Sequence, residues 1–180
     1  MLGSAVALVG IAGRNAQLVR AVEESGVYDG LTRCFNSTHG MGLLRTELQR
    51  ARRQKAPFAL IMLDLDHFKA INDSYGHLCG DAVLAAVGQR MRDVLRDSDT
   101  KCRSGGEEFM VLLPDTPRSG ALHVAESLRR QLAETSVTWN GKNVSTTASI
   151  GLAMALPREA SQTTLLGRAD AALYRAKDGG

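Results

Sequence analysis

The segment Arg103–Phe109 reads RSGGEEF: two glycines, two carboxylates and then an apolar residue. The residues that follow, Phe109–Leu113, predict a strand, so the glycines mark a turn at its mouth. Upstream, the nearly continuous apolar run Phe58–Leu65 predicts a second strand, covered on both faces and ending in acids at Asp64 and Asp66. Two strands with carboxylates at one edge predict an acidic site for a hard divalent cation.

Both acidic pairs also have simpler explanations. Two glycines followed by two acids are common in solvated turns, although adjacent like charges repel at a hairpin tip unless a cation relieves them. Asp64 and Asp66 share one side of their strand, since residues two apart point the same way. Burying an unpaired carboxylate is costly, so Asp64 needs either a metal or a donor such as Lys69 or an arginine.

Helical and strand patterns alternate along the rest of the chain. A helix is expected over 82–95 with Asp81 as its N-cap, and Arg96–Asp99 follows it as a basic cap and an exposed turn. Asn140-Gly141 is a hairpin signal within 137–144. Further predicted helices cover 14–26, 38–54, 68–75, 119–136 and 165–176, and a strand covers 146–155. The fold class is therefore α/β or α+β, with helices packed on a mixed sheet.

Composition restricts the classes of function. The chain has 180 residues, enough for one domain with a sizeable core, and a net charge of +3. That charge is too small to argue for a nucleic-acid partner, although it would attract a small polyanionic substrate. The three cysteines are odd in number and lack metal-ligand spacing, so we expect free thiols in a reducing cytosol.

The N-terminal segment is apolar but short. Residues 2–13 fall below the ~20 apolar residues that a membrane span needs, and no signal-peptide pattern surrounds them. They are the last turns of a membrane helix, a linker helix, or residues added by cloning. The sequence does not choose among these three.

Taken together, the motifs resemble the GGDEF diguanylate cyclase family over about residues 28–180. Gly105–Phe109 resembles the family's signature, in its GGEEF form. Asp64–Asp73 resembles the family's D-x-D-x-F-K-x-x-N-D segment. The remaining matching segments are Asp29–Thr32 with Asn36, Tyr75–His77 with Gly80 and Asp81, Ser149–Gly151, and Ala169–Lys177. Residues 1–27 would then be an N-terminal linker helix or residues added by cloning.

This resemblance implies a fold, a reaction and partners. The fold would be a mixed, mainly antiparallel sheet wrapped by helices, akin to nucleotidyl cyclase and polymerase palm domains. The reaction would condense two GTP molecules into cyclic di-GMP and release two pyrophosphates, with Mg²⁺ or Mn²⁺ as cofactor. Each domain would hold one GTP, so a symmetric homodimer would be part of the mechanism. No nucleic acid is expected as a partner.

The resemblance also assigns roles by position. Asp64, Glu107 and the Leu65 carbonyl would bind the metal. Glu107, Glu108 and Asp64 would form the catalytic group, with Glu107 helping to deprotonate the 3′-hydroxyl. Asn72 and Asp81 would recognise guanine, and the phosphate-binding group would comprise Lys69, Lys177 and the amides near His67 and Phe68.

Arg96 and Asp99 form an R-x-x-D pattern that in the family is the inhibitory site for the product. Arg129 or Arg130 would assist there. Two alternatives to an active cyclase remain: a silent receptor for GTP or cyclic di-GMP, and a competent domain that is inactive without an upstream sensor that dimerises it. We expect a cytoplasmic domain, and attachment of the parent protein to a membrane through its N-terminal region stays an open alternative.

Overall fold

The computed structural model describes residues 26–156 and 161–179. The helix expected over 14–26 falls outside this part of the chain, apart from Gly26, and the domain boundary near residue 28 stays a prediction. Among the described residues, no helix combines the length and apolarity that crossing a membrane requires.

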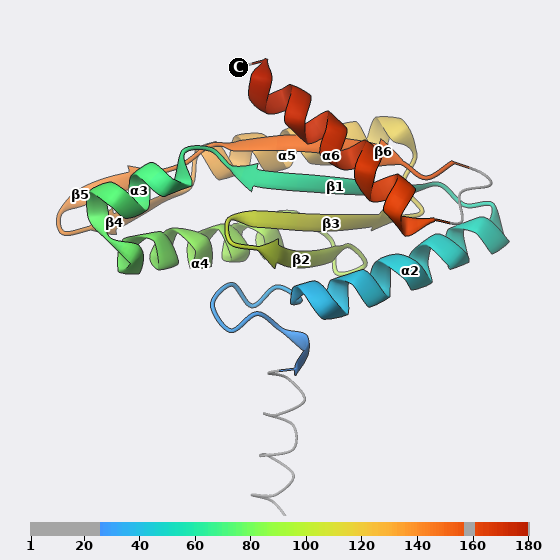
Figure 1. Ribbon diagram of the computed structural model, residues 1–180, viewed down its shortest axis with the longest axis horizontal. Coiled ribbons are helices and arrows are strands. Elements are labelled where there is room, and N and C mark those ends of the chain that lie inside the picture. Colours follow the sequence, from blue (N-terminus) through green and yellow to red (C-terminus); the bar gives the residue numbers. More distant parts are fainter. Residues whose placement is uncertain (1–25, 157–160, 180) are drawn as a thin grey trace, which may run out of the picture.

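A four-stranded antiparallel sheet forms the centre of the molecule (Figure 1). Its order is β2 (Thr100–Gly105), β3 (Glu108–Pro114), β1 (Phe58–Leu65) and β6 (Ala148–Met154). Every residue of β1 is buried, as its continuous apolar run predicts. Phe35 adds an isolated parallel bridge to Cys102 at the β2 edge, while the named strands pair antiparallel.

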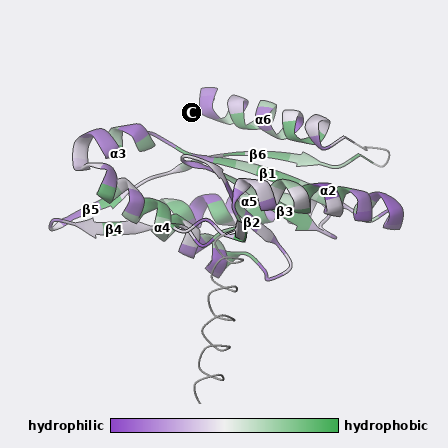
Figure 2. Cartoon of the chain, turned by 60° about the horizontal axis from the view of Figure 1, so that its bottom comes forward, coloured by the Kyte–Doolittle hydropathy of each residue, from purple (hydrophilic) through white to green (hydrophobic). Residues whose placement is uncertain are grey.

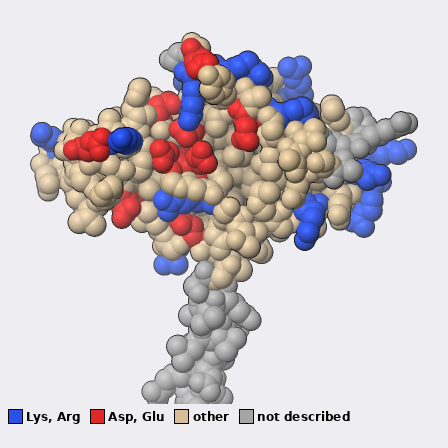
Figure 3. Space-filling view, in the orientation of Figure 1, with Lys and Arg blue, Asp and Glu red and all other residues tan. Residues whose placement is uncertain are grey.

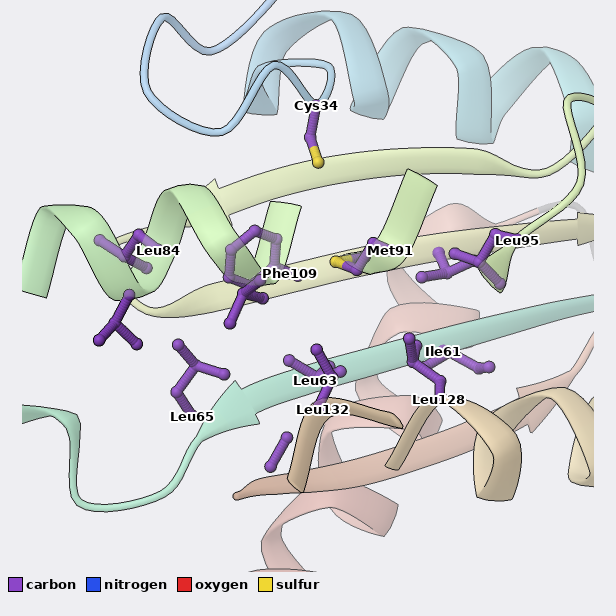
Figure 4. Packing of buried hydrophobic residues seen from close by; sticks show 14 of the residues in the cluster. Cys34, Ile61, Leu63, Leu65, Leu84, Met91, Leu95, Phe109, Leu128 and Leu132 are labelled. Atoms are coloured by element: carbon purple, nitrogen blue, oxygen red, sulfur yellow. The ribbon is translucent and has the colours of Figure 1, made fainter. Parts of the chain in front are cut away.

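Two helices cover each face of this sheet. The helices α2 (Ser37–Gln54) and α6 (Gln162–Asp178) pack on one face, and α4 (His77–Val94) and α5 (Arg118–Ala133) pack on the other. Successive residues of a strand point to opposite faces, so β1 supplies both layers of core. Ile61 and Leu63 join the α4–α5 layer, seen in Figure 4, whereas Leu60 and Met62 join the α2–α6 layer.

Hydrophobic colouring follows the central strands in Figure 2, while α3 (Phe68–Tyr75) and the end of α2 are coloured largely as hydrophilic. The expected hairpin is present as β4 (Ser136–Trp139) and β5 (Lys142–Ser145). Asn140 and Gly141 both have positive φ, of 49° and 77°, as a tight hairpin turn requires. The predicted α+β class with a mainly antiparallel sheet is therefore confirmed.

Two local predictions were wrong. Asp81 is not an N-cap, because α4 begins at His77 with Gly76 as its cap and Asp81 lies inside the helix. The turn at Arg96–Asp99 is not wholly exposed, because the Asp99 carboxyl folds back into it and is only 5% exposed. The three cysteines are free and buried, and burial raises the pKa of Cys102 to about 12.

Candidate active site

The acidic ends of β1 and β3 meet at one edge of the sheet. Asp64 pairs in register with Glu108, and the Leu65 amide donates to the Glu107 carbonyl at 3.3 Å. Directly paired residues share a face of the sheet, so Asp64 and Glu108 lie together. Asp64 is only 8% exposed, whereas Glu107 is half-buried and Glu108 is exposed. Figure 3 shows Asp and Glu side chains gathered near the middle of this side of the molecule, with Lys and Arg among them.

Lys177 is the donor that meets Asp64. Its Nζ lies 2.8 Å from Asp64 Oδ2, and it reaches the strand from the last turn of α6. Sequence reasoning considered Lys69 or an arginine for this ion pair. The partner is instead a lysine more than a hundred positions away in the chain, which the resemblance had assigned to phosphate.

A pocket of about 290 Å³ opens beside this ion pair. Its lining residues are Asp64, Asp66, His67, Thr147, Ser149 and Lys177. Asp66 accepts hydrogen bonds from Thr147 Oγ1 at 2.6 Å and Ser149 Oγ at 2.7 Å, which fix its carboxylate against the start of β6. Thr147 had not been singled out, and Ser149 had been noted only as part of a motif. No local sequence signal identifies them, because these hydroxyls meet Asp66 only where β6 pairs with the end of β1.

The short helix α3 borders this pocket. His67 has a left-handed backbone, with φ of 55°, and precedes the helix, while Phe68 is 6% exposed and anchors it in the core. Lys69 is exposed on its first turn. Backbone amides at a helix start favour anions, so the arrangement suits a phosphate group entering next to His67.

Asn72 and Asp81 are placed by close packing of α3 against α4. A Cβ added to Gly80 would come within 2.0 Å of Asn72 Oδ1, so the absent side chain makes room for the amide. Asp81 is the next residue of α4 and is exposed. Neither residue lines the pocket beside Lys177, so Asn72 and Asp81 form a polar group separate from it.

The glycine turn of the signature is held by Arg103. Its Nε and Nη2 donate to the Gly106 carbonyl at 2.9 and 2.8 Å, and its Nη1 lies 3.1 Å from Asp29 Oδ2. Burial works to raise the pKa of Asp29, but hydrogen bonds from Thr32 and the Arg103 guanidinium outweigh it and hold that pKa below its ordinary value. The turn that carries Glu107 is thereby tied to the N-terminal loop.

The R-x-x-D residues form a closed turn ahead of β2. The Arg96 amide donates to Asp99 Oδ2 at 3.0 Å, and the Arg96 side chain is exposed. Arg129 pairs with Glu126 at 2.9 Å on α5, and Arg130 lies 3.9 Å from the same residue. Both candidate helpers thus face an acid of their own helix.

The donor set fits a magnesium ion completed by its substrate. Among the described residues, no three His, Cys, Asp or Glu side chains converge as a metal cage. Magnesium is commonly held by one or two carboxylates together with substrate phosphates. Asp64, Glu107 and the Leu65 carbonyl carry hard oxygen atoms at these two neighbouring strand ends, so they are the residues that would hold such an ion.

Comparison with known proteins identifies the family. The model of the family described as "Diguanylate cyclase, GGDEF domain" matches residues 26–180. Diguanylate cyclase A of Treponema denticola is 41% identical over 71% of this chain and 34% of its own length, and diguanylate cyclase VdcA of Vibrio cholerae is 38% identical over 87% and 46%. The chain thus spans about a third to a half of these relatives.

Solved structures agree with this assignment. The coiled coil and GGDEF domain of DgcB from Caulobacter crescentus, in complex with c-di-GMP, has a TM-score of 0.87 and 29% identity, covering 97% of this chain and 93% of that one. Diguanylate cyclase SiaD from Pseudomonas aeruginosa, solved with its activator SiaC, has a TM-score of 0.84 and 36% identity, covering 96% and 68%. The chain belongs to the GGDEF diguanylate cyclase family, in which metal and nucleotide binding are general properties.

Proposed function

We propose that this chain condenses two GTP molecules into cyclic di-GMP and releases two pyrophosphates. The observation that carries the proposal is the pairing of Asp64 with Glu108 and of Leu65 with Glu107, which places the acidic ends of two strands together. The related diguanylate cyclases and the neighbouring c-di-GMP complex support the same reaction class.

Asp64, Glu107 and the Leu65 carbonyl would hold Mg²⁺ or Mn²⁺. A bound divalent ion lowers the pKa of the attacking hydroxyl and neutralises charge on the leaving pyrophosphate. Glu107 would accept the 3′-hydroxyl proton of one GTP, and Glu108 would add negative potential beside it. The 3′-oxygen then bonds to the α-phosphorus of the other GTP as the bond to pyrophosphate breaks, and the same exchange in the opposite direction closes the ring.

Substrate binding would use the two polar groups around α3. Asn72 offers both a donor and an acceptor and Asp81 an acceptor, which suits the edge of a guanine base. Lys69, Lys177 and the amides near His67 and Phe68 would hold the phosphates. Two domains must face one another, so the proposed active form is a homodimer of the region from residue 28 onward, acting in the cytoplasm where GTP is found.

Arg96 and Asp99 are proposed to bind the product and inhibit synthesis, with Arg129 or Arg130 as helpers. Arginine suits bidentate contacts with phosphate and guanine. An upstream sensor in the parent protein would set how often two domains meet.

The test is incubation of the concentrated protein with GTP and Mg²⁺, with cyclic di-GMP measured by chromatography over a range of protein concentrations. We expect product to rise faster than linearly with protein, because dimer encounter limits the rate. Glu107→Gln should abolish synthesis and leave the circular dichroism spectrum unchanged, while Asp115→Asn, a surface control, should retain activity. Tight cyclic di-GMP binding without any synthesis would favour the receptor alternative, and full activity of Glu107→Gln would remove Glu107 from the mechanism.

A further inference from the structure

Lys177 neutralises a carboxylate that the proposed reaction needs for its metal. The Asp64 side chain is 12% exposed, whereas that of Lys177 is 41% exposed, so a partly exposed cation reaches a largely buried anion. A carboxylate this deep in a sheet is costly unless a cation accompanies it. The ammonium group therefore supplies, in the nucleotide-free domain, the positive charge that a metal ion would otherwise supply.

We propose that Lys177 is a resident counter-ion of the metal site. In the nucleotide-free protein its ammonium group holds Asp64 in place, and it releases Asp64 when a divalent ion binds together with GTP. This inference rests on the proposed function, because it takes Asp64 as a metal ligand. It adds a competition between lysine and metal for one carboxylate.

The attachment of α6 allows this exchange. Leu165, Ala169 and Leu173 bury the helix against the sheet, and Lys177 lies one turn beyond the last of them. The lysine side chain can therefore move while the helix stays packed. The pocket that it lines also contains His67 at the start of α3, so an ammonium released from Asp64 remains beside the proposed phosphate position.

A coupling between metal and nucleotide follows. A metal ion alone has to displace Lys177 from Asp64, whereas a metal ion that arrives with phosphates provides the lysine with a new anionic partner. Metal and nucleotide should then strengthen one another's binding by the same factor, as linkage requires. A fixed ion pair with no exchange would give no such coupling through Lys177.

The experiment is titration of the nucleotide-free protein with Mn²⁺, followed by electron paramagnetic resonance. Lys177→Met keeps the side-chain length without its charge and should bind Mn²⁺ about five-fold more tightly than the wild type, as loss of a competing ion pair implies. Lys177→Arg should behave as the wild type. Arg175→Met removes an exposed charge from the same turn and should change affinity less than two-fold.

In the same titration with a non-hydrolysable GTP analogue present, the order of Mn²⁺ affinities should reverse. Lys177→Met should then bind Mn²⁺ more weakly than the wild type. Thermal unfolding gives an independent result: in EDTA, Lys177→Met should melt below the wild type, and saturating Mn²⁺ should close that gap. Equal Mn²⁺ affinity of the two proteins, or a gap that Mn²⁺ leaves open, would overturn the counter-ion role while the cyclase proposal stands. If Asp64→Asn binds Mn²⁺ as the wild type does, with or without the analogue, Asp64 is no metal ligand and the proposed function fails with it.

Discussion

Arg103 connects residues that are far apart in the chain. Its guanidinium donates to the Gly106 carbonyl of the signature turn and to the Asp29 carboxylate of the N-terminal loop. The Arg103 side chain is 18% exposed and that of Asp29 is 23% exposed. Charge-assisted hydrogen bonds in such partly buried places are stronger than neutral ones. The ion pair thus stabilises the turn from which Glu107 projects.

Asp29→Asn should therefore lower the free energy of unfolding by about 1 kcal/mol at neutral pH. The pKa of Asp29 is depressed in the folded state, so its stabilising effect is present above the unfolded carboxyl pKa and is lost as pH falls through the lower folded value. Urea unfolding at neutral pH and at about pH 3 should show the difference between variant and wild type shrinking in acid.

Asp115→Asn is the control for this comparison, because Asp115 pairs with Arg50 at 2.8 Å but its side chain is 57% exposed. Exposed pairs contribute little, so its unfolding curve should stay close to the wild type at both pH values. A pH-independent loss in Asp29→Asn would show that its effect does not arise from its charge.

At the scale of elements, the contact of α6 with β6 positions Lys177. A Cβ added to Gly151 would lie 2.3 Å from both the Ala169 carbonyl oxygen and the Leu173 amide nitrogen, so the helix backbone rests directly on the strand. Gly151→Ala should force α6 away and destabilise the fold by about 3 kcal/mol, through overpacking against backbone. Differential scanning calorimetry would measure the loss.

Gly167→Ala, within α6 itself, is the matched control. A Cβ there meets nothing within 4 Å, so alanine should raise stability by about 0.5–1 kcal/mol through its helix propensity. Equal melting temperatures for the two alanine variants would contradict the close approach of α6 to β6.

Strong local patterns made some elements predictable. The predicted bounds of β1 and α3 match the structure, since a continuous apolar run and a short amphipathic segment follow one another. The strand β2 was not foreseen, because TKCRSG has one buried apolar residue and becomes a strand only by pairing with β3. The start of α4 was misplaced because Gly80 signals a turn locally, yet it is needed inside the helix where Asn72 packs on it.

The candidate site shows the same limit. Motif spacing placed acids at two strand ends, and the register of β1 with β3 brings those ends together. Motif spacing could not predict that Lys177 pairs with Asp64 or that the Thr147 hydroxyl bonds to Asp66. Those contacts depend on how α6 and β6 return to the end of β1. Such contacts are set by tertiary packing.

At the scale of the whole molecule, feedback would act over a distance. Arg96 precedes β2, and the signature turn begins where β2 ends. The length of that strand, about 17–20 Å, therefore separates Arg96 from the signature turn. Product bound at Arg96 would therefore inhibit by changing how two domains meet and not by filling the pocket of the same chain.

Arg96→Ala should accordingly raise the cyclic di-GMP concentration needed for half-inhibition at least ten-fold, with the uninhibited rate unchanged. Initial rates with added product would measure it, beside Arg45→Ala, which removes an exposed arginine of α2. Identical inhibition in Arg96→Ala and the wild type would exclude the R-x-x-D turn as the regulatory site.

The signature carboxylates stand outside the core that holds the molecule together. Phe109 is fully buried, but Glu108 before it is exposed and Glu107 is half-buried. Substitution of either acid should therefore change the chemistry of the site without unfolding the protein. A variant that lacks both acids should likewise keep its fold, and with it the nucleotide-binding surface proposed around α3.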